Sequence, residues 1–306
     1  MSNLQHLLST KQFSKEDLLS LFEEAQEMEK ILEIGGENLL QGKIMATLFF
    51  EPSTRTRFSF ETAMLRLGGK VISNADMLAT SSTRKQETLE DTGKTVSQMA
   101  DVIVMRHPEA GTVERLARFS DVPVINAGDG GNDHPTQGLL DLYTIWKEKG
   151  AIDGLTVGIV GDLKFGRVVH AQCRLLSHFD VNFVLVSPKG LEIPSDLAQE
   201  LNGKNKKIEL AEDLADVIEK LDVISMTRVQ EERFKDRAEY EKYADAYVLD
   251  KKLMDKAKNN AIVIHPLPRV HEIATEVDSD PRAKYFEQPK NGVVVRMALL
   301  KQILNG

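Results

Sequence analysis

The feature that most constrains the fold is a regular alternation, along the whole chain, of short apolar runs with segments of helical periodicity. Mostly apolar runs of strand length lie at 43–50, 70–75, 101–105, 122–128, 155–162, 181–187, 206–210, 222–226 and 261–267. Helices are expected between them and at both ends, at 14–33, 54–67, 113–119, 135–149, 167–178, 195–202, 213–221, 250–258 and 292–304. Continuous apolar runs are typical of strands buried in parallel sheets. The sequence therefore predicts an α/β protein of two domains, each a mostly parallel sheet flanked by helices and doubly wound.

Length and composition restrict the class of protein further. A chain of 306 residues suggests two domains, and 42% hydrophobic with 28% charged residues is typical of a soluble globular protein. The single cysteine, Cys173, cannot form an internal disulfide, and no apolar run approaches the roughly 20 residues that span a bilayer. Because the N-terminus also lacks the pattern of a signal peptide, we expect a cytoplasmic protein with no membrane contact. The net charge of −8 argues against nucleic acid as a partner.

Within this acidic chain, several arginines stand in or beside the loops that follow the predicted strands. They are Arg55, Arg57, Arg106, Arg167, Arg228, Arg269 and Arg296. Ligands of doubly wound folds bind beyond the carboxyl ends of strands, and guanidinium groups bind phosphate and carboxylate through paired hydrogen bonds. A pocket for anions is one interpretation of this pattern. Scattered ion pairs are the other, and for any single arginine the second is the better hypothesis.

The strongest local signal is Ser-Thr-Arg-Thr-Arg at 53–57, between a predicted strand and a predicted helix. Three hydroxyls, two guanidiniums and the N–H groups of a helix N-terminus are expected to converge there, as a phosphate would require. The alternative is a well-capped helix with surface arginines. A cap needs only Ser53, however, and leaves Thr54, Arg55 and Thr56 without a role.

Other segments are less specific. The stretch 161–168 resembles a nucleotide-binding loop but has Arg167 and Val168 where lysine and a hydroxyl are needed, so we expect this turn to direct Arg167 into a cleft. His134 opens a helix, where the dipole would keep it neutral and able to polarise a carbonyl, although an exposed cap is equally plausible.

Residues 76–92 are predicted to form a long polar loop with a function. Neither the histidines nor Cys173 have the spacing of a metal site.

Five motifs, in this order, resemble those of the aspartate carbamoyltransferase family: Ser-Thr-Arg-Thr-Arg at 53–57, Met-Arg-His-Pro at 105–108, His-Pro-Thr-Gln at 134–137, Met-Thr-Arg-Val-Gln at 226–230 and His-Pro-Leu-Pro-Arg at 265–269. Together they cover essentially the whole chain. The resemblance implies a carbamoyl-phosphate-binding domain at 1–133 with a returning helix at 290–306, and an aspartate-binding domain at 134–289. It also implies a homotrimer with sites shared between subunits, and leaves open whether regulatory chains join a larger assembly.

The resemblance also implies roles for individual residues. The phosphate would be bound by Ser53, Thr54, Arg55 and Thr56, with Arg106. The carbamoyl group would be surrounded by Thr56, Arg106, His134 and Gln137, and its amide would donate to the carbonyl oxygens of Leu267 and Pro268. The aspartate carboxylates would be held by Arg167, Arg228 and Gln230. Ser81 and Lys85 of the polar loop would reach a neighbouring subunit's site, where Lys85 would also contact aspartate; Arg84 stands where the family often has a second lysine. The groups at the reacting centre would be Arg55, Thr56, Lys85, Arg106 and His134.

The implied reaction transfers a carbamoyl group from carbamoyl phosphate to the amine of L-aspartate, an early step of pyrimidine biosynthesis, with no metal and no cofactor. Preorganised donors would stabilise the oxyanion of a tetrahedral intermediate. Ornithine carbamoyltransferase is a rival, but the arginine at 228 does not suit a cationic substrate. A non-catalytic phosphometabolite-binding protein is another, but it leaves Arg167, Arg228 and Gln230 without a role.

Overall fold

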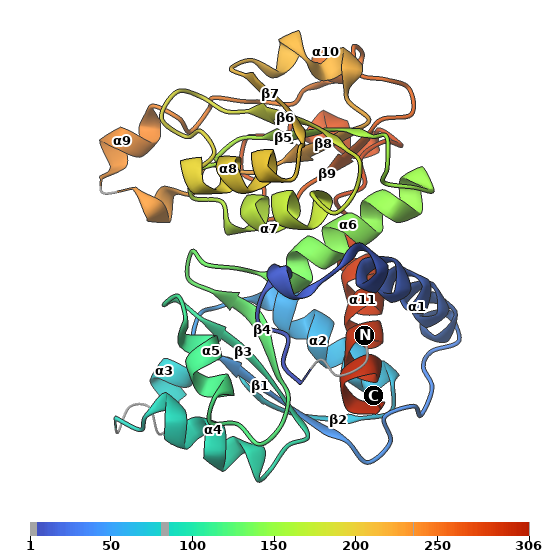
Figure 1. Cartoon of the computed structure of the whole chain (residues 1–306), viewed down its shortest axis with the longest axis vertical. Coiled ribbons are helices and arrows are strands. Elements are labelled where there is room, and N and C mark those ends of the chain that lie inside the picture. The colour runs from blue at the N-terminus through green and yellow to red at the C-terminus, as the bar shows by residue number, and fades with distance from the viewer. Residues whose placement is uncertain (1–4, 81–85, 235, 306) are drawn as a thin grey trace. The chain divides into compact units, whose positions relative to one another are not determined.

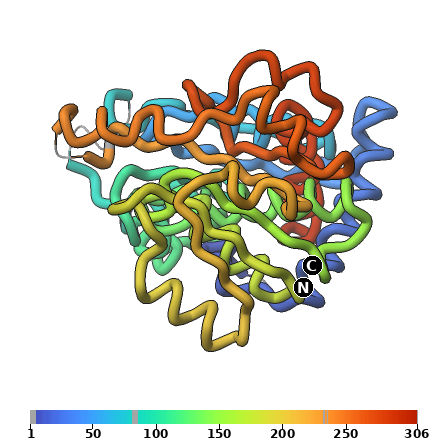
Figure 2. Tube along the Cα trace, turned by 90° about the horizontal axis from the view of Figure 1, so that it is seen from above, coloured from blue at the N-terminus to red at the C-terminus, as the bar shows by residue number. Residues whose placement is uncertain are grey.

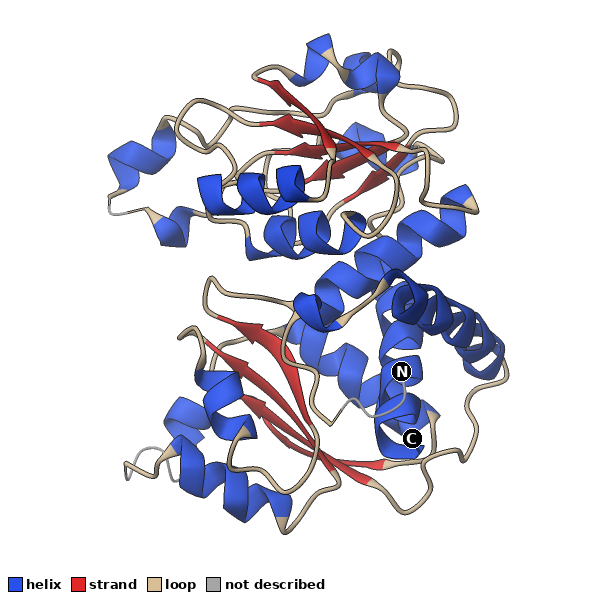
Figure 3. Cartoon of the chain, viewed as in Figure 1, coloured by secondary structure: helices blue, strands red, loops and turns tan. Residues whose placement is uncertain are grey.

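The computed structural model describes residues 5–80, 86–234 and 236–305 (Figure 1). The chain forms two compact units: residues 1–140 with 289–306, called the first unit, and residues 141–288, called the second unit. Figure 3 shows a sheet with helices on both faces in each of them. The predicted fold class is confirmed. Among the described residues, no helix is both long and apolar enough to cross a membrane.

The sheet of the first unit has four parallel strands in the order β2-β1-β3-β4. They are β1 (Ile44–Phe49), β2 (Lys70–Asn74), β3 (Val102–His107) and β4 (Val124–Asp129). The chain adds β2 on one side of β1 and then β3 and β4 on the other side. The strand order therefore reverses between β1 and β3, where the loops at the carboxyl ends diverge and leave room for a ligand.

Helices cover both faces of this sheet. The elements of the first unit are η1 (Thr10–Gln12), α1 (Lys15–Glu33), α2 (Thr54–Arg66), α3 (Met77–Thr80), α4 (Leu89–Ser97), α5 (Thr112–Ala117), the start of α6 (Pro135–Lys149) and nearly all of α11 (Gln288–Asn305). Figure 1 shows α3, α4 and α5 on one face and α2 with α11 on the other. The last helix lies beside α1 and α2 (Figures 1 and 2), where Lys301 pairs with Glu24 and Arg296 donates to Ser59.

The sheet of the second unit has five parallel strands in the order β7-β6-β5-β8-β9. They are β5 (Thr156–Val160), β6 (Asn182–Val186), β7 (Lys207–Ala211), β8 (Val223–Met226) and β9 (Ile262–Ile264). Here the strand order reverses between β5 and β8. The helices α7 (Arg167–Leu176) and α8 (Ser195–Gly203) lie on one face, and the short α10 (Lys251–Met254) lies on the other (Figure 1).

Three predicted segments differ from the structure. The helix expected at 213–221 is a pair of 3-10 turns, η3 (Leu214–Asp216) and η4 (Ile218–Lys220), which still bury Leu214 and Ile218. The apolar spacing that predicted a helix is still used, since Val217 and Leu221 are buried as well. The polar loop expected at 76–92 contains α3 and the start of α4. The sequence did not predict α4, because this helix buries Thr92, Gly93 and Ser97 rather than large apolar residues. It packs closely at Gly93, where a Cβ would lie 3.0 Å from a backbone oxygen of Leu116.

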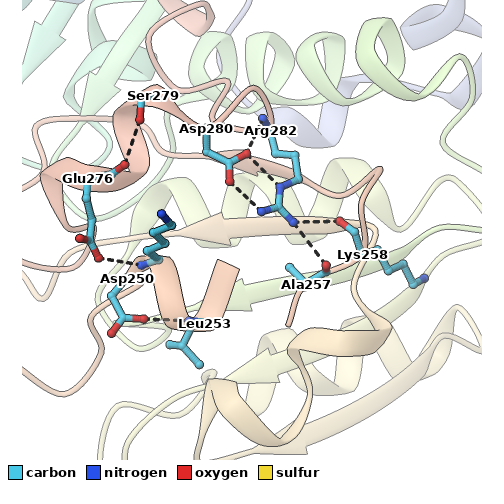
Figure 4. A network of polar contacts seen from close by, with 9 residues as sticks. Asp250, Leu253, Ala257, Lys258, Glu276, Ser279, Asp280 and Arg282 are labelled. Atoms are coloured by element: carbon cyan, nitrogen blue, oxygen red, sulfur yellow. Dashed lines mark hydrogen bonds and ion pairs between the residues drawn. The ribbon is translucent and has the colours of Figure 1, made fainter. Parts of the chain in front are cut away.

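The helix expected at 250–258 is also shorter, since only α10 is regular. Asp250 caps it by accepting a hydrogen bond from the Leu253 N–H at 2.8 Å (Figure 4). Beyond the helix, Arg282 pairs with Asp280 and donates to the carbonyl oxygens of Ala257 and Lys258. Here a charged network, rather than a longer helix, holds the chain. The short elements η5 (Glu231–Arg233), α9 (Arg237–Glu241) and η6 (Thr275–Ser279), which the sequence did not predict, complete this unit.

Candidate active site

In the first unit, the predicted phosphate-binding residues gather at one edge of the sheet. Arg55 lies just beyond β1, Arg106 lies at the end of β3, and His134 follows β4. These three strands are neighbours and run parallel, with Phe49 of β1 opposite Arg106 of β3. Their carboxyl ends therefore share an edge, at the point where the strand order reverses. Each residue comes from a different loop, and the sheet brings them together.

The N-terminus of α2 is suited to an anion. Ser53 has the extended conformation of an N-cap residue, but its hydroxyl makes no capping hydrogen bond, and no acidic residue lies in the first turn. The backbone N–H groups of this turn and the hydroxyls of Ser53 and Thr54 are therefore not used in a conventional cap. Thr56 is buried at 6% exposure. A helix N-terminus with such groups binds phosphate through N–H donors and the helix dipole.

Two guanidinium groups reinforce the positive potential at this edge. Burial lowers the pKa of Arg55, and the neighbouring charge of Arg106 lowers it further. Burial also lowers the pKa of Arg106, although Glu51 opposes this through an ion pair of 3.1 Å with Nε. Two cations held close together while partly desolvated are stabilised by an anion between them. Glu51 was not singled out from the sequence, because nothing in the motif indicates that a carboxylate would orient Arg106.

His134 and Gln137 lie at the start of α6. His134 is buried at 3% exposure, so the alternative of an exposed cap is wrong. Its backbone N–H donates to Asp133 at 2.8 Å, and the other oxygen of Asp133 accepts from the backbone and hydroxyl of Thr10. Gln137 is half-buried one turn into the helix. Asp133 thus fixes the backbone that carries His134.

Three other arginines have structural partners in place of the anion role that the pattern suggested. Arg57 lies 3.8 Å from Glu61 and donates to Ser73, so the two guanidiniums of the 53–57 motif do not converge as predicted. Arg296 is buried and donates to the hydroxyls of Ser59 and Thr136, which joins α11 to α2 and α6. Arg269 pairs with Asp278.

In the second unit, the predicted aspartate-binding residues also gather at one edge of the sheet. Arg167 is the first residue of α7, in the connection after β5, and Arg228 and Gln230 follow β8. These strands are the neighbours between which the strand order reverses. All three side chains are half-buried. A second pair of arginines at the ligand-binding edge is suited to carboxylates, which guanidinium groups bind in bidentate fashion.

The turn after β5 holds these two loops close together. Gly161 has φ of 125°, and a Cβ there would lie 2.2 Å from the carbonyl oxygen of Thr227, so only glycine permits this approach. The next residue, Asp162, accepts from the backbone N–H of Phe165 at 2.9 Å and also from that of Gln230. Burial raises the pKa of Asp162 although these hydrogen bonds oppose it. The sequence did not identify Asp162, because Gln230, the partner that joins it to the loop after β8, is distant in the chain.

Leu267 and Pro268 lie beyond β9, the neighbour of β8. Leu267 has φ of 53°, a left-handed conformation that leucine rarely adopts, so the surrounding structure must hold this turn in place. Of the other predicted residues, Ser81, Arg84 and Lys85 lie outside the described residues. Each described member of the predicted site is therefore at the carboxyl edge of its own sheet.

The described residues include no cluster of candidate metal ligands, and the single thiol is buried. In the part of the chain that the structure describes, no group of three or more His, Cys, Asp or Glu is placed to hold a metal ion. Burial raises the pKa of Cys173 to about 12, so this residue remains an uncharged thiol within the core. The first edge offers guanidinium, hydroxyl, imidazole and backbone donors, and the second offers guanidinium and amide donors, all of which suit anionic substrates.

Comparisons with known proteins agree with this arrangement. A family model described as the carbamoyl-P binding domain of aspartate/ornithine carbamoyltransferase matches residues 5–147, and one described as the Asp/Orn binding domain matches residues 153–303. The aspartate carbamoyltransferase catalytic subunit of Methanopyrus kandleri is 49% identical, over 98% of this chain and 97% of that protein. The corresponding subunit of Clostridium novyi is 50% identical over 98% of each.

Solved structures are similar over the same length. The catalytic subunit of Methanocaldococcus jannaschii aspartate transcarbamoylase matches with a TM-score of 0.92 at 48% identity, over 99% of this chain and 98% of that one. The Trypanosoma cruzi aspartate transcarbamoylase in complex with carbamoyl phosphate and aspartate matches with a TM-score of 0.93 at 42% identity, over 98% and 97%. Both family models match this chain, and its relatives are about 50% identical to it in sequence over nearly their full length. The chain therefore belongs to the aspartate/ornithine carbamoyltransferase family.

Proposed function

We propose that the chain transfers the carbamoyl group of carbamoyl phosphate to the amine of L-aspartate, giving N-carbamoyl-L-aspartate and phosphate. The observation that carries this proposal is the presence of arginines at both ligand-binding edges, one pair in each unit. Phosphate binding alone would require only Arg55 and Arg106. The second pair, Arg167 and Arg228, suits an acceptor that carries two carboxylates, as aspartate does.

In the first unit, the phosphate of the donor substrate lies at the N-terminus of α2. Ser53, Thr54, Arg55 and Thr56 bind its oxygens, and Arg106 bridges it to the carbamoyl group. His134 and Gln137 contact the carbamoyl oxygen and amide, and the carbonyl oxygens of Leu267 and Pro268 accept hydrogen bonds from the amide. This assignment makes the first unit, with the returning α11, the carbamoyl-phosphate half.

In the second unit, Arg167, Arg228 and Gln230 hold the two carboxylates of aspartate. The neutral amine attacks the carbamoyl carbon, a C–N bond forms, and the oxyanion of the tetrahedral intermediate is stabilised by Arg55, Thr56, Arg106 and His134. The C–O bond to phosphate then breaks, and the departing phosphate takes the proton of the amine. No side chain has to act as a strong base, because the leaving group itself accepts the proton. Positioning and electrostatic stabilisation supply most of the acceleration.

The assembly proposed for this reaction is a homotrimer in the cytoplasm that provides an early step of pyrimidine biosynthesis. Ser81 and Lys85 of one subunit complete the site of its neighbour, and Lys85 contacts both the reacting centre and aspartate. Separate regulatory chains are compatible with this assembly. The relatives are named catalytic subunits, and this name supports an assembly of more than one chain.

The test is an acceptor assay with the purified chain. Carbamoyl phosphate labelled at the carbamoyl carbon is incubated with aspartate or with ornithine, and the carbamoylated product is separated and counted. We expect product with aspartate only. Product with ornithine would assign the rival activity of the family, and tight binding of carbamoyl phosphate with no turnover of either amino acid would indicate a binding protein.

A further inference from the structure

A network of buried polar side chains lies beneath the turn at 265–272 in the second unit. Its central residue is His265, which follows β9 directly and is 1% exposed. Its partner Glu272 is 7% exposed. Buried polar groups are retained only where each has a hydrogen-bond partner, so the pairing at this point is informative.

The hydrogen bonds of His265 determine its protonation state. The backbone N–H of Leu267 donates to Nδ1 at 2.8 Å, so this nitrogen carries no proton. Nε2 lies 2.7 Å from the carboxylate of Glu272, and because a carboxylate can only accept, Nε2 carries the proton and donates it. Burial lowers the pKa of His265, which agrees with a neutral ring. The imidazole therefore accepts a hydrogen bond from the backbone of the turn and donates one to Glu272, and these two roles cannot be exchanged.

Glu272 fixes the other end of the same turn. Its second oxygen accepts from the backbone N–H groups of Val270 and His271, at 3.1 and 3.0 Å. Burial alone would raise the pKa of Glu272, but the hydrogen bonds from His265 and from backbone N–H groups lower it. An ionised Glu272 and a neutral His265 thus hold the backbone on both sides of Leu267, the residue with the left-handed conformation.

Hydrogen bonds connect His265 to four other elements. The backbone N–H of His265 donates to Oε1 of Gln288 at 2.7 Å, and Nε2 of Gln288 donates to Asp141 at 2.7 Å. The other oxygen of Asp141 accepts from Gln172 at 2.6 Å, and Gln172 in turn accepts from Ser225 at 2.9 Å. These hydrogen bonds form a continuous path of buried side chains from His265 to Ser225. It holds the end of β9 against the first residue of α11 and against α6, α7 and β8.

We propose that His265 is a positioning residue for carbamoyl phosphate. By accepting the Leu267 N–H, the neutral imidazole fixes the peptide group that precedes Leu267, while Glu272 fixes the N–H groups of Val270 and His271. The carbonyl oxygens of Leu267 and Pro268 lie on the stretch of chain between these two fixed points. The proposal rests on the proposed function, in which carbonyl oxygens of Leu267 and Pro268 accept from the carbamoyl amide. The ligand group that depends on His265 is therefore the amide, and the phosphate does not depend on it.

The experiment compares two ligands that differ in this group. Under the proposed function, carbamoyl phosphate has an amide that contacts the turn, whereas inorganic phosphate has no such group. In His265→Leu we expect the dissociation constant of carbamoyl phosphate to rise by about tenfold to a hundredfold. The inhibition constant of inorganic phosphate should stay within about twofold. His265→Asn keeps an acceptor near the position of Nδ1 and should recover most of the loss.

Two further variants control for simple destabilisation. Glu272→Gln retains the imidazole but cannot accept from His265, Val270 and His271 together, so it should show the same selective loss if His265→Leu does not fold. His6→Leu is the matched control, because His6 Nδ1 accepts a backbone N–H from Val124 at 3.1 Å in the first unit. This variant loses the same kind of hydrogen bond and should leave the ratio of the two ligand affinities unchanged.

Each outcome has one meaning. Selective loss for carbamoyl phosphate in His265→Leu and Glu272→Gln, with recovery in His265→Asn, supports the proposal. Equal loss for both ligands, or no loss, overturns it while leaving the proposed function intact. Failure of the wild-type chain to bind carbamoyl phosphate at all would overturn the proposed function instead, before any variant is compared.

Discussion

At the scale of single residues, the same side chain has different roles according to what it contacts. Arg55 and Arg57 are two positions apart on α2. Burial lowers the pKa of Arg55, and the neighbouring charge of Arg106 lowers it further. Arg57 instead neighbours Glu61 and Ser73. Because Glu61 and Ser73 hold its guanidinium, we expect Arg57 to contribute little to the anion site, whereas Glu51 orients Arg106 at the end of β3.

This contrast yields a matched pair of variants. Arg55→Ala should lower kcat/KM by about a hundredfold to a thousandfold, the cost of removing one preorganised donor from a developing oxyanion or phosphate. Arg57→Ala, on the same helix, should change it by less than about threefold. Steady-state kinetics with both substrates measures both effects, and circular dichroism checks that each variant is folded. Similar losses in the two variants would show that the helix, rather than Arg55, carries the effect.

A second prediction concerns the other unit. Arg228→Ala should raise the KM for aspartate by about a hundredfold, as expected for the loss of a charge-assisted bidentate contact of about 3 kcal/mol. The affinity for carbamoyl phosphate should be retained, since the proposal assigns Arg228 to the carboxylates alone. Calorimetric titration with carbamoyl phosphate, and kinetics with aspartate, separate the two substrates. Equal weakening of both would mean that the aspartate site has been misplaced.

At the scale of elements, strands and amphipathic helices were predictable because burial imposes a pattern on their sequence. The strand β1 is a continuous apolar run, and α1 shows its capping box, Ser14 with Asp17, directly in the sequence. The helix α4 was not predictable, since it packs through Gly93 and small polar residues. The 3-10 turns at 214–220 were not predictable either, because their buried residues Leu214, Val217 and Ile218 have the spacing that an α-helix would also bury.

The candidate site, like the fold, could be predicted from the sequence only in part. Residues that would touch substrate stand in recognisable motifs, and the motifs follow strands, so their places at the sheet edge could be predicted. The carboxylates that orient them could not. Glu51, Asp162 and Glu272 act through partners from other elements or from a turn whose backbone path the sequence does not reveal.

The buried histidines of the second unit predict how stability depends on pH. Burial lowers the pKa of His170 and of His265 below the ordinary value of about 6.5. As the pH falls through that value, the unfolded chain binds protons that the folded chain does not, so unfolding becomes more favourable. We therefore expect the melting temperature to fall between about pH 7.5 and 5.5.

His170→Gln tests the cause of this pH dependence. Nε2 of His170 lies 2.9 Å from the carbonyl oxygen of Leu163, and a glutamine amide can donate to the same oxygen without titrating. The decrease in melting temperature on acidification should be smaller in this variant. His271→Gln, which changes an exposed histidine, is the control and should melt as the wild type does at both pH values. An unchanged decrease in His170→Gln would assign the pH dependence to other groups.

At the scale of the whole molecule, each unit has its own sheet, its own reversal of strand order and its own arginine pair. The chain returns to the first unit through α11, which Arg296 and Lys301 join to α1, α2 and α6. A donor-binding half and an acceptor-binding half built in this way each carry only part of the chemistry. The proposed homotrimer adds a third contribution, because Lys85 would serve the site of a neighbouring subunit.

Complementation between two inactive variants tests this sharing. Arg55→Ala and Lys85→Ala chains should each give inactive homotrimers, since every site then lacks one of the two residues. When equal amounts are mixed under conditions that allow subunits to exchange, about a quarter of the sites should combine a wild-type Arg55 from one chain with a wild-type Lys85 from its neighbour. Activity should therefore return to roughly that fraction of the wild-type value. If Lys85 served the site of its own chain, every site in the mixture would still carry one defect, and confirmed exchange without any return of activity would exclude the shared site.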